Sequence, residues 1–209
     1  KDFKLAGYTI NDFKNAGYTI NDFKNNNFIE AGYNINDFLT ASYTYKNLRD
    51  GGFTIRDLIK GNITNTYTTI REIKNAGYTI KELMNEKYFS IQMLKSAGYE
   101  ITIPDFMNSN LYTIKELKDA GYQFTIQNFK GYTLQALLNV GFLKNDFKKI
   151  DQNNVAKNIS ILKKSFGFTA SDMKKLGYSM KEIYLDYTQE EIDKAYNCYI
   201  HPKFGRICE

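Results

Sequence analysis

Apolar and polar positions repeat along most of the chain with a period of ten residues. The consensus is Ala-Gly-Tyr-Thr-Ile-x-Asp/Glu-Phe/Leu-Lys-x, and the first complete copies are residues 6–15 and 16–25. Ile10, Phe13 and Ala16 are spaced by three, which places apolar side chains on one face of a helix. A ten-residue β-solenoid turn is the alternative, because Gly-Tyr-Thr-Ile also suits a strand. The spacing of three favours one short helix per copy.

Both ends of each predicted helix carry a signal. Thr9 is a good N-cap, and Asp12, three residues later, completes a capping-box pattern. Gly17 lies where a left-handed residue ends a helix. Tyr18 is placed to cover the end of the finished helix and to pack against the aromatic residue in the first turns of the next one. The pattern therefore predicts a helix over residues 10–16 and its equivalents.

Short helices of this kind must stack to be stable. A two-turn helix does not persist alone, because its nucleus is costly to form. Repeats that bury their apolar faces on their neighbours form a solenoid. We therefore predict an all-α solenoid of short capped helices, closed by a longer C-terminal helix, with loops at residues 25–27 and 61–66 where the spacing is irregular. Further capping positions are Asn34, Thr44, Thr54, Thr69, Thr79, Ser90, Thr102, Thr113, Thr125, Thr133, Thr169 and Ser179.

The periodicity divides the chain into three predicted parts. Residues 1–143 form the repeat array, which we expect to continue upstream because the first copy is incomplete. Residues 144–195 form a helical cap with two further repeats, and Thr188 opens its last helix with a full capping box. Residues 196–209 are an aromatic tail without a regular pattern.

One longer amphipathic helix is predicted within the cap. Apolar residues follow one another there at intervals of four, three and four, and Gly167 comes directly after the last of them. Such a helix suits an element that closes the open end of a stack. The four residues are Val155, Ile159, Leu162 and Phe166.

Positive charge is concentrated in one segment. The chain has a formal net charge of +5, and residues 144–175 hold eight lysines against three aspartates. This patch is a candidate for binding nucleic acid or an acidic protein, although lysines on amphipathic helices more often form a solvated face. The candidate residues are Lys148, Lys149, Lys163, Lys164, Lys174 and Lys175.

Two cysteines and one histidine lie close together near the C-terminus. Cys198, His201 and Cys208 are weak candidates for a zinc site, since a tetrahedral site needs a fourth ligand such as Asp193 or Glu209. A disulfide and ordinary free thiols are the alternatives, and we expect the thiols. Two cysteines are too few to staple a fold of this size, which favours a reducing compartment.

The sequence offers little catalytic chemistry. A nucleophile and base pair would have to use His201, and the recurring carboxylates occupy capping positions. Glycine-rich phosphate loops and the common metal motifs are missing from the sequence. No run of eighteen apolar residues predicts a membrane span. We therefore expect a protein that is not an enzyme and has no cofactor and no small-molecule substrate.

The consensus Ala-Gly-Tyr/Phe-Thr/Ser-x-x-Asp/Glu-Leu/Phe-Lys, in a background rich in Asn, Lys and Ile, resembles the decapeptide-repeat proteins of giant DNA viruses of the mimivirus group. The resemblance covers residues 1–143 and 168–187. It implies a viral origin, a short-helix solenoid, and a location in the virion or in the viral factory of the host cytoplasm. The implied role is a structural scaffold with other proteins as partners in a large assembly, and a nucleic-acid-binding module is the alternative.

Overall fold

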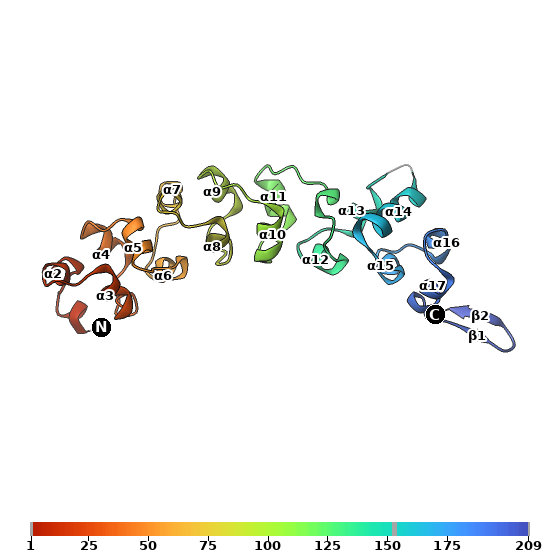
Figure 1. Ribbon diagram of the computed structural model, residues 1–209, viewed down its shortest axis with the longest axis horizontal. Coiled ribbons are helices and arrows are strands. Elements are labelled where there is room, and N and C mark those ends of the chain that lie inside the picture. The colour runs from red at the N-terminus through yellow and green to blue at the C-terminus, as the bar shows by residue number, and fades with distance from the viewer. Residues whose placement is uncertain (1, 152–153, 209) are drawn as a thin grey trace. The chain divides into compact units, whose positions relative to one another are not determined.

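The computed structural model describes residues 2–151 and 154–208 and contains two compact units, Lys1–Tyr112 and Thr113–Glu209 (Figure 1). Each unit is a series of short helices joined by tight turns. The division by compactness does not test the predicted boundary at residue 143, which rests on sequence periodicity. In the described residues the chain is mostly helical, and the predicted all-α solenoid of short capped helices is confirmed.

Ten helices lie in the part of unit 1 that the structure describes, residues 2–112. They are α1 (Asp2–Leu5), α2 (Ile10–Asn15), α3 (Ile20–Asn25), α4 (Ile35–Thr40), α5 (Tyr45–Asp50), α6 (Ile55–Lys60), α7 (Tyr67–Asn75), α8 (Ile80–Met84), α9 (Ile91–Ser96) and α10 (Ile103–Ser109). Unit 2 contains α11 (Ile114–Asp119), the 3₁₀ helix η1 (Ile126–Phe129), α12 (Leu134–Asn139), α13 (Lys144–Lys148), α14 (Val155–Phe166), α15 (Ala170–Lys175), α16 (Met180–Ile183), α17 (Gln189–Ala195), β1 (Cys198–His201) and β2 (Gly205–Cys208).

The predicted caps are present at both ends of α2. The Thr9 hydroxyl accepts from the Asp12 amide at 3.2 Å, and the Asp12 carboxylate accepts from the Thr9 amide at 2.7 Å. At the other end Gly17 has a φ of 93°, and the Tyr18 amide donates to the Phe13 carbonyl at 3.0 Å. This is a Schellman motif, which satisfies the last carbonyls of the helix. The β-solenoid alternative is therefore wrong.

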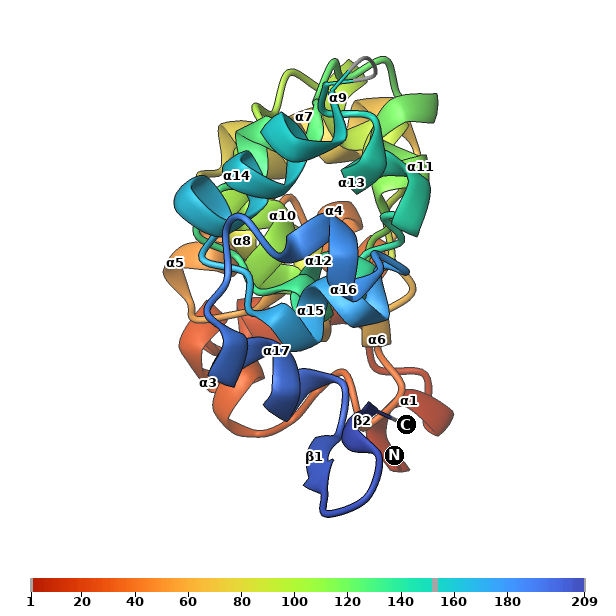
Figure 2. The same cartoon turned by 90° about the vertical axis from the view of Figure 1, so that its right-hand side faces the viewer.

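Several helices pack on the second helix after them, which gives about two helices to each coil. In unit 1, α2 contacts α4, α5 contacts α7, α7 contacts α9, and α8 contacts α10. Figure 2 shows α7 beside α9, with α8 and α10 together on another side of the same unit. In unit 2, α14 contacts α16, and α15 contacts α17. Side chains also reach the third helix after their own, so we call the contact of a helix with the second and third helices after it a joint.

The apolar positions of the consensus form a continuous core in each unit. Ile35 and Phe38 of α4 and Leu48 of α5 are buried, as the spacing of three predicts. Burial of a side chain of this size contributes about 1.5–3 kcal/mol. The first copies are more open, and Tyr8 and Tyr18 are 52% and 41% exposed.

One predicted helix start is wrong. The sequence places the cap of the helix that contains Ile70 at Thr69, but α7 begins one turn earlier and is capped by Thr66. Thr69 is buried, and its hydroxyl lies 2.7 Å from that of Thr64 and 2.8 Å from that of Thr66. These contacts give the buried Thr69 hydroxyl hydrogen-bond partners inside the helix. Because the start has moved, Glu72 no longer belongs to the first turn.

The C-terminal part contains one element that the sequence does not predict and one that it does. Helix α13 follows Leu143, whose side chain cannot cap, but the Asp146 carboxylate still accepts from the Leu143 amide at 2.7 Å. Helix α14 is the predicted longer helix, and Gly167 has a φ of 71° at its end. It packs within the series against α13 and α16.

The tail forms a hairpin where the sequence predicts no regular element. Strands β1 and β2 are antiparallel, and Cys198 faces Cys208 in the register. The two cysteines form a disulfide, so the expected free thiols are wrong. This cross-link is at odds with the expected reducing compartment, because disulfides persist mainly in oxidising ones.

Candidate protein-interaction site

Tyrosine hydroxyls connect successive coils. The Tyr33 hydroxyl donates to the Tyr8 carbonyl at 2.8 Å, and the Tyr78 hydroxyl donates to the Phe53 carbonyl at 2.7 Å. The same contact recurs in both units, so the consensus tyrosine ties coils together in addition to covering helix ends. Further pairs of donor and acceptor are Tyr88 and Ile63, Tyr99 and Tyr78, Tyr112 and Phe89, Tyr187 and Phe168, and Tyr196 and Tyr178.

The buried hydroxyl of Tyr178 is an exception among the described residues. It has no hydrogen-bond partner, although Tyr178 occupies a consensus ring position. Burial, with a smaller effect of the Glu182 carboxylate, raises the pKa of Tyr178 to about 12. The neutral phenol is therefore the form that the fold stabilises.

The consensus lysine lies over an aromatic ring of the next coil. The Lys14 ammonium is 4.6 Å from the centroid of the Tyr43 ring and donates to the Ala41 carbonyl at 2.8 Å. Cations gain electrostatic energy over aromatic faces, and the aliphatic stem covers apolar surface. In unit 2, Lys163 lies 4.2 Å from the centroid of the Tyr187 ring.

At three joints of unit 1 the cation also pairs with a capping carboxylate. The cation and the carboxylate are 33 residues apart, and the ring immediately precedes the N-cap that the carboxylate serves. We call the three side chains a triad. The triads are Lys4 with Tyr33 and Asp37, Lys24 with Phe53 and Asp57, and Arg49 with Tyr78 and Glu82.

Two of the triad carboxylates have lowered pKa values. Burial of Asp57 would raise its pKa, but hydrogen bonds from Lys24 and Thr54 outweigh this effect and hold the pKa below its usual value. Burial likewise opposes the lowering of the Glu82 pKa, and hydrogen bonds from Thr79 together with the charge of Arg49 overcome it. Burial raises the pKa of Tyr78. One carboxylate thus serves a helix cap and a joint at once.

The six candidate lysines of unit 2 divide into two groups. Lys148 donates to the Gly177 carbonyl at 3.1 Å and lies over the Tyr178 ring, and Lys163 and Lys174 lie over the rings of Tyr187 and Tyr196. These three lysines are engaged in joints. The exposed residues Lys149, Lys164 and Lys175 are not placed over a ring. Three of the six candidate side chains thus contact rings of their own unit.

The weak metal candidates do not assemble a metal site in this structure. Cys198 and Cys208 are bonded to each other. The Nδ1 atom of His201 accepts from the amides of Lys203 and Phe204 at 3.1 and 3.2 Å, which stabilises the hairpin turn. Among the described residues no group of three or more His, Cys, Asp or Glu side chains is arranged to hold a metal ion.

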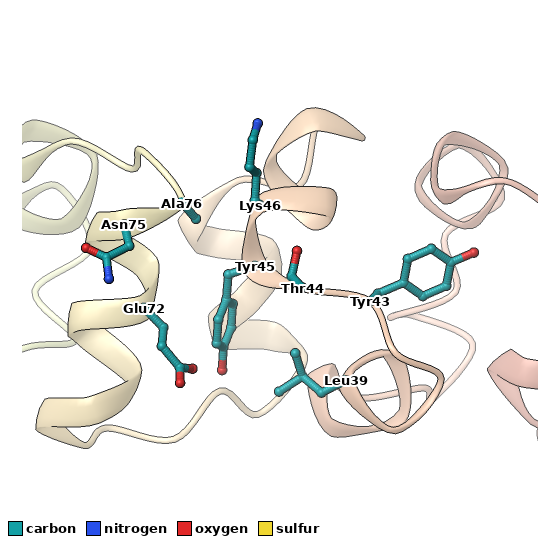
Figure 3. A pocket seen from close by; sticks show the side chains of 8 residues that line it. All are labelled: Leu39, Tyr43, Thr44, Tyr45, Lys46, Glu72, Asn75 and Ala76. Carbon is teal, nitrogen blue, oxygen red and sulfur yellow. The ribbon is translucent and has the colours of Figure 1, made fainter.

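An open groove of about 550 Å³ lies in unit 1 between α4, α5 and α7 (Figure 3). Tyr45 and Glu72 lie side by side in it, and Leu39 extends toward the same side. Burial first and the Glu72 carboxylate second raise the pKa of the Tyr45 phenol, while a hydrogen bond with Thr69 acts in the opposite direction. The lining residues are Leu39, Tyr43, Thr44, Tyr45, Lys46, Glu72, Asn75 and Ala76.

The groove coincides with an incomplete triad. Leu39 stands at the cation position and Thr68 at the ring position, whereas Glu72 keeps the carboxylate position 33 residues after Leu39. Glu72 has no ion pair within the described chain. The ten-residue periodicity alone does not reveal this site, whereas a comparison of positions 33 residues apart shows that the cation is missing at Leu39.

Comparisons with known proteins give no further guide. No protein-family model, no curated protein and no solved structure matches the chain. None of the helices that the structure describes has the length and apolar character needed to cross a membrane.

Proposed function

We propose that the chain is a non-enzymatic scaffold or protein-interaction component of a large assembly, and that this assembly is a giant-virus particle. The observation that carries the proposal is that the recurring polar residues serve the fold itself. Asp57 caps a helix and pairs with Lys24, and Tyr78 ties two coils. Residues used in this way support an extended framework, as in other repeat proteins.

Two observations further support a binding role. The recurring carboxylates accept hydrogen bonds from the amides of their own caps, and the single histidine accepts two turn amides. These contacts give each group a structural role that needs no substrate. The groove beside Glu72 adds a recessed surface with an unpaired charge, which suits contact with another protein.

Sedimentation of the native protein from its source tests this role. The gradient is run with and without nuclease and at low and high salt. A scaffold component is expected to comigrate with a large protein particle under all four conditions. Migration as a free monomer throughout would contradict the proposal.

The same gradient separates the scaffold role from nucleic-acid binding. Release by nuclease or by salt would favour the lysines of unit 2 instead, because phosphate contacts weaken steeply with salt. The candidates for that role are Lys148, Lys149, Lys163, Lys164, Lys174 and Lys175, of which Lys149, Lys164 and Lys175 are exposed and do not lie over a ring.

A further inference from the structure

We propose that the groove between α4, α5 and α7 binds a lysine or arginine side chain of a partner protein, held between Tyr45 and Glu72. The bound cation would replace the one that the repeat lacks at Leu39. This inference rests on the proposed function as an interaction component and names the chemistry of the partner.

The complete triads show what this arrangement holds. Lys24 approaches the Asp57 carboxylate to 2.7 Å while its ammonium lies 5.7 Å from the centroid of the Phe53 ring. Arg49 approaches Glu82 to 3.3 Å and lies 4.7 Å from the centroid of the Tyr78 ring. A ring and a carboxylate that face one joint therefore accept either type of cation in this fold.

Three departures from the consensus meet in the groove. Leu39 replaces the lysine found at Lys4, Lys14 and Lys24, and Tyr45 replaces the isoleucine found at Ile35 and Ile55. The extra turn of α7 removes Glu72 from capping, which is the role of the equivalent Glu82. The result is an aromatic ring beside a carboxylate that pairs with no cation of the described chain.

The directions of the side chains fit an external cation. In Figure 3, Tyr45 and Glu72 extend to one side of the groove, and Lys46 points to the other. The Lys46 ammonium pairs with Asp50 at 2.9 Å, so it does not neutralise Glu72. An incoming lysine or arginine can place its aliphatic stem along Leu39 and its charge at Glu72.

Binding is tested on the full chain with two dipeptides, N-acetyl-Phe-Lys-amide and the norleucine analogue N-acetyl-Phe-Nle-amide. The Phe-Lys pair is the chain's own motif at Phe13-Lys14 and Phe23-Lys24. We expect the lysine dipeptide to shift the NMR signals of Tyr45 and to bind about tenfold more tightly than the norleucine analogue. Equal affinities for the two dipeptides would overturn the proposal.

Two substitutions locate the interaction. Glu72→Gln removes the carboxylate charge, and Leu39→Lys supplies the missing cation from within the chain. Each is expected to weaken binding of the lysine dipeptide about tenfold, and Leu39→Lys is also expected to raise the melting temperature. Glu190→Gln, on an exposed residue of α17, is the matched control and should leave binding unchanged. Affinity that is insensitive to both groove substitutions would overturn the proposal.

The two proposals fail in different ways. If the wild-type protein comigrates with a particle but binds neither dipeptide, the groove proposal is overturned and the scaffold role stands. If the protein binds the lysine dipeptide through Glu72 but sediments as a monomer, the groove proposal stands and the scaffold role is overturned.

Discussion

Two joints of unit 1 differ in whether a triad is present. The joint of Arg49 has all three members, with Arg49 between the Tyr78 ring and the Glu82 carboxylate. The joint of Leu39 has only Glu72 in its expected place, and a groove opens there. Both joints are nevertheless formed. The triad is therefore an addition to the stack and is not required for stacking.

Apolar packing is what the two joints share. Leu48 in the first and Phe38 in the second are fully buried. At the joint of Leu39 the Ile35 amide donates to the Gly61 carbonyl at 2.7 Å, so the backbones also approach closely. Apolar burial is therefore common to both joints, whereas only the joint of Arg49 holds a cation between a ring and a carboxylate.

The largest predicted effect comes from the shared apolar packing. Leu48→Ala should lower the free energy of unfolding by about 2–5 kcal/mol, because it removes buried methyl groups and leaves a cavity at the joint of Arg49. Chemical denaturation monitored by circular dichroism measures the change. The exposed neighbour Lys46→Ala is the control, and a similar loss for both variants would contradict the importance of burial.

A second prediction concerns the joint that lacks a triad. A Cβ at Gly61 would lie 2.9 Å from both the Ile29 Cδ1 and the Ile35 Cγ1 atoms. Gly61→Ala should therefore destabilise unit 1 by about 1–3 kcal/mol through overpacking. Gly51→Ala, which would meet Ile20 at 2.8 Å, should behave alike. If both variants melted at the wild-type temperature, the coils would not be closely packed at Gly61 and Gly51.

Local features of this fold follow from the sequence. Thr9, Asp12 and Gly17 act within one copy, so their roles in capping can be predicted from spacing alone. The start of α7 is harder to predict, because Thr66 and Thr69 are both good caps and only the contacts of the buried Thr69 decide between them. A cap signal specifies a helix but does not choose between two neighbouring caps.

The candidate site depends on contacts between distant copies, and the spacing of residues within one copy does not reveal these contacts. A lysine at a regular position suits a solvated face as well as a joint, and only the contact of α5 with α8 shows that Arg49 reaches Glu82. The missing cation at Leu39 becomes meaningful only after that contact is known. The hairpin is likewise not predictable from periodicity, since the pairing of Cys198 with Cys208 has no copy elsewhere in the chain.

A third prediction separates the hydroxyl ties from the packing. Tyr78→Phe keeps the buried ring but leaves the Phe53 carbonyl without its donor, and it should cost about 1 kcal/mol. Tyr8→Phe is the matched control, because Tyr8 is exposed and its hydroxyl has no hydrogen bond within the described chain. Thermal denaturation of the two variants makes the comparison. If the two variants were equally stable, the hydrogen bond from the Tyr78 hydroxyl would add nothing to the stability that the buried ring provides.

The smallest effect concerns the charge of the triad. The pKa of Glu82 is lower in the folded state than in the unfolded state, so its contribution to stability is present above the unfolded pKa, near 4.3, and is lost as the pH falls through the folded value. Glu82→Gln keeps a capping oxygen but removes this charge. Because the pair is partly exposed, we expect the variant to melt only about 1–3 °C below the wild type at pH 7 and at the same temperature near pH 2. The corresponding Glu72→Gln variant should show no such difference, since Glu72 has no cation of its own chain to lose. A pH-dependent difference of equal size at both positions would mean that the two joints do not differ in charge pairing.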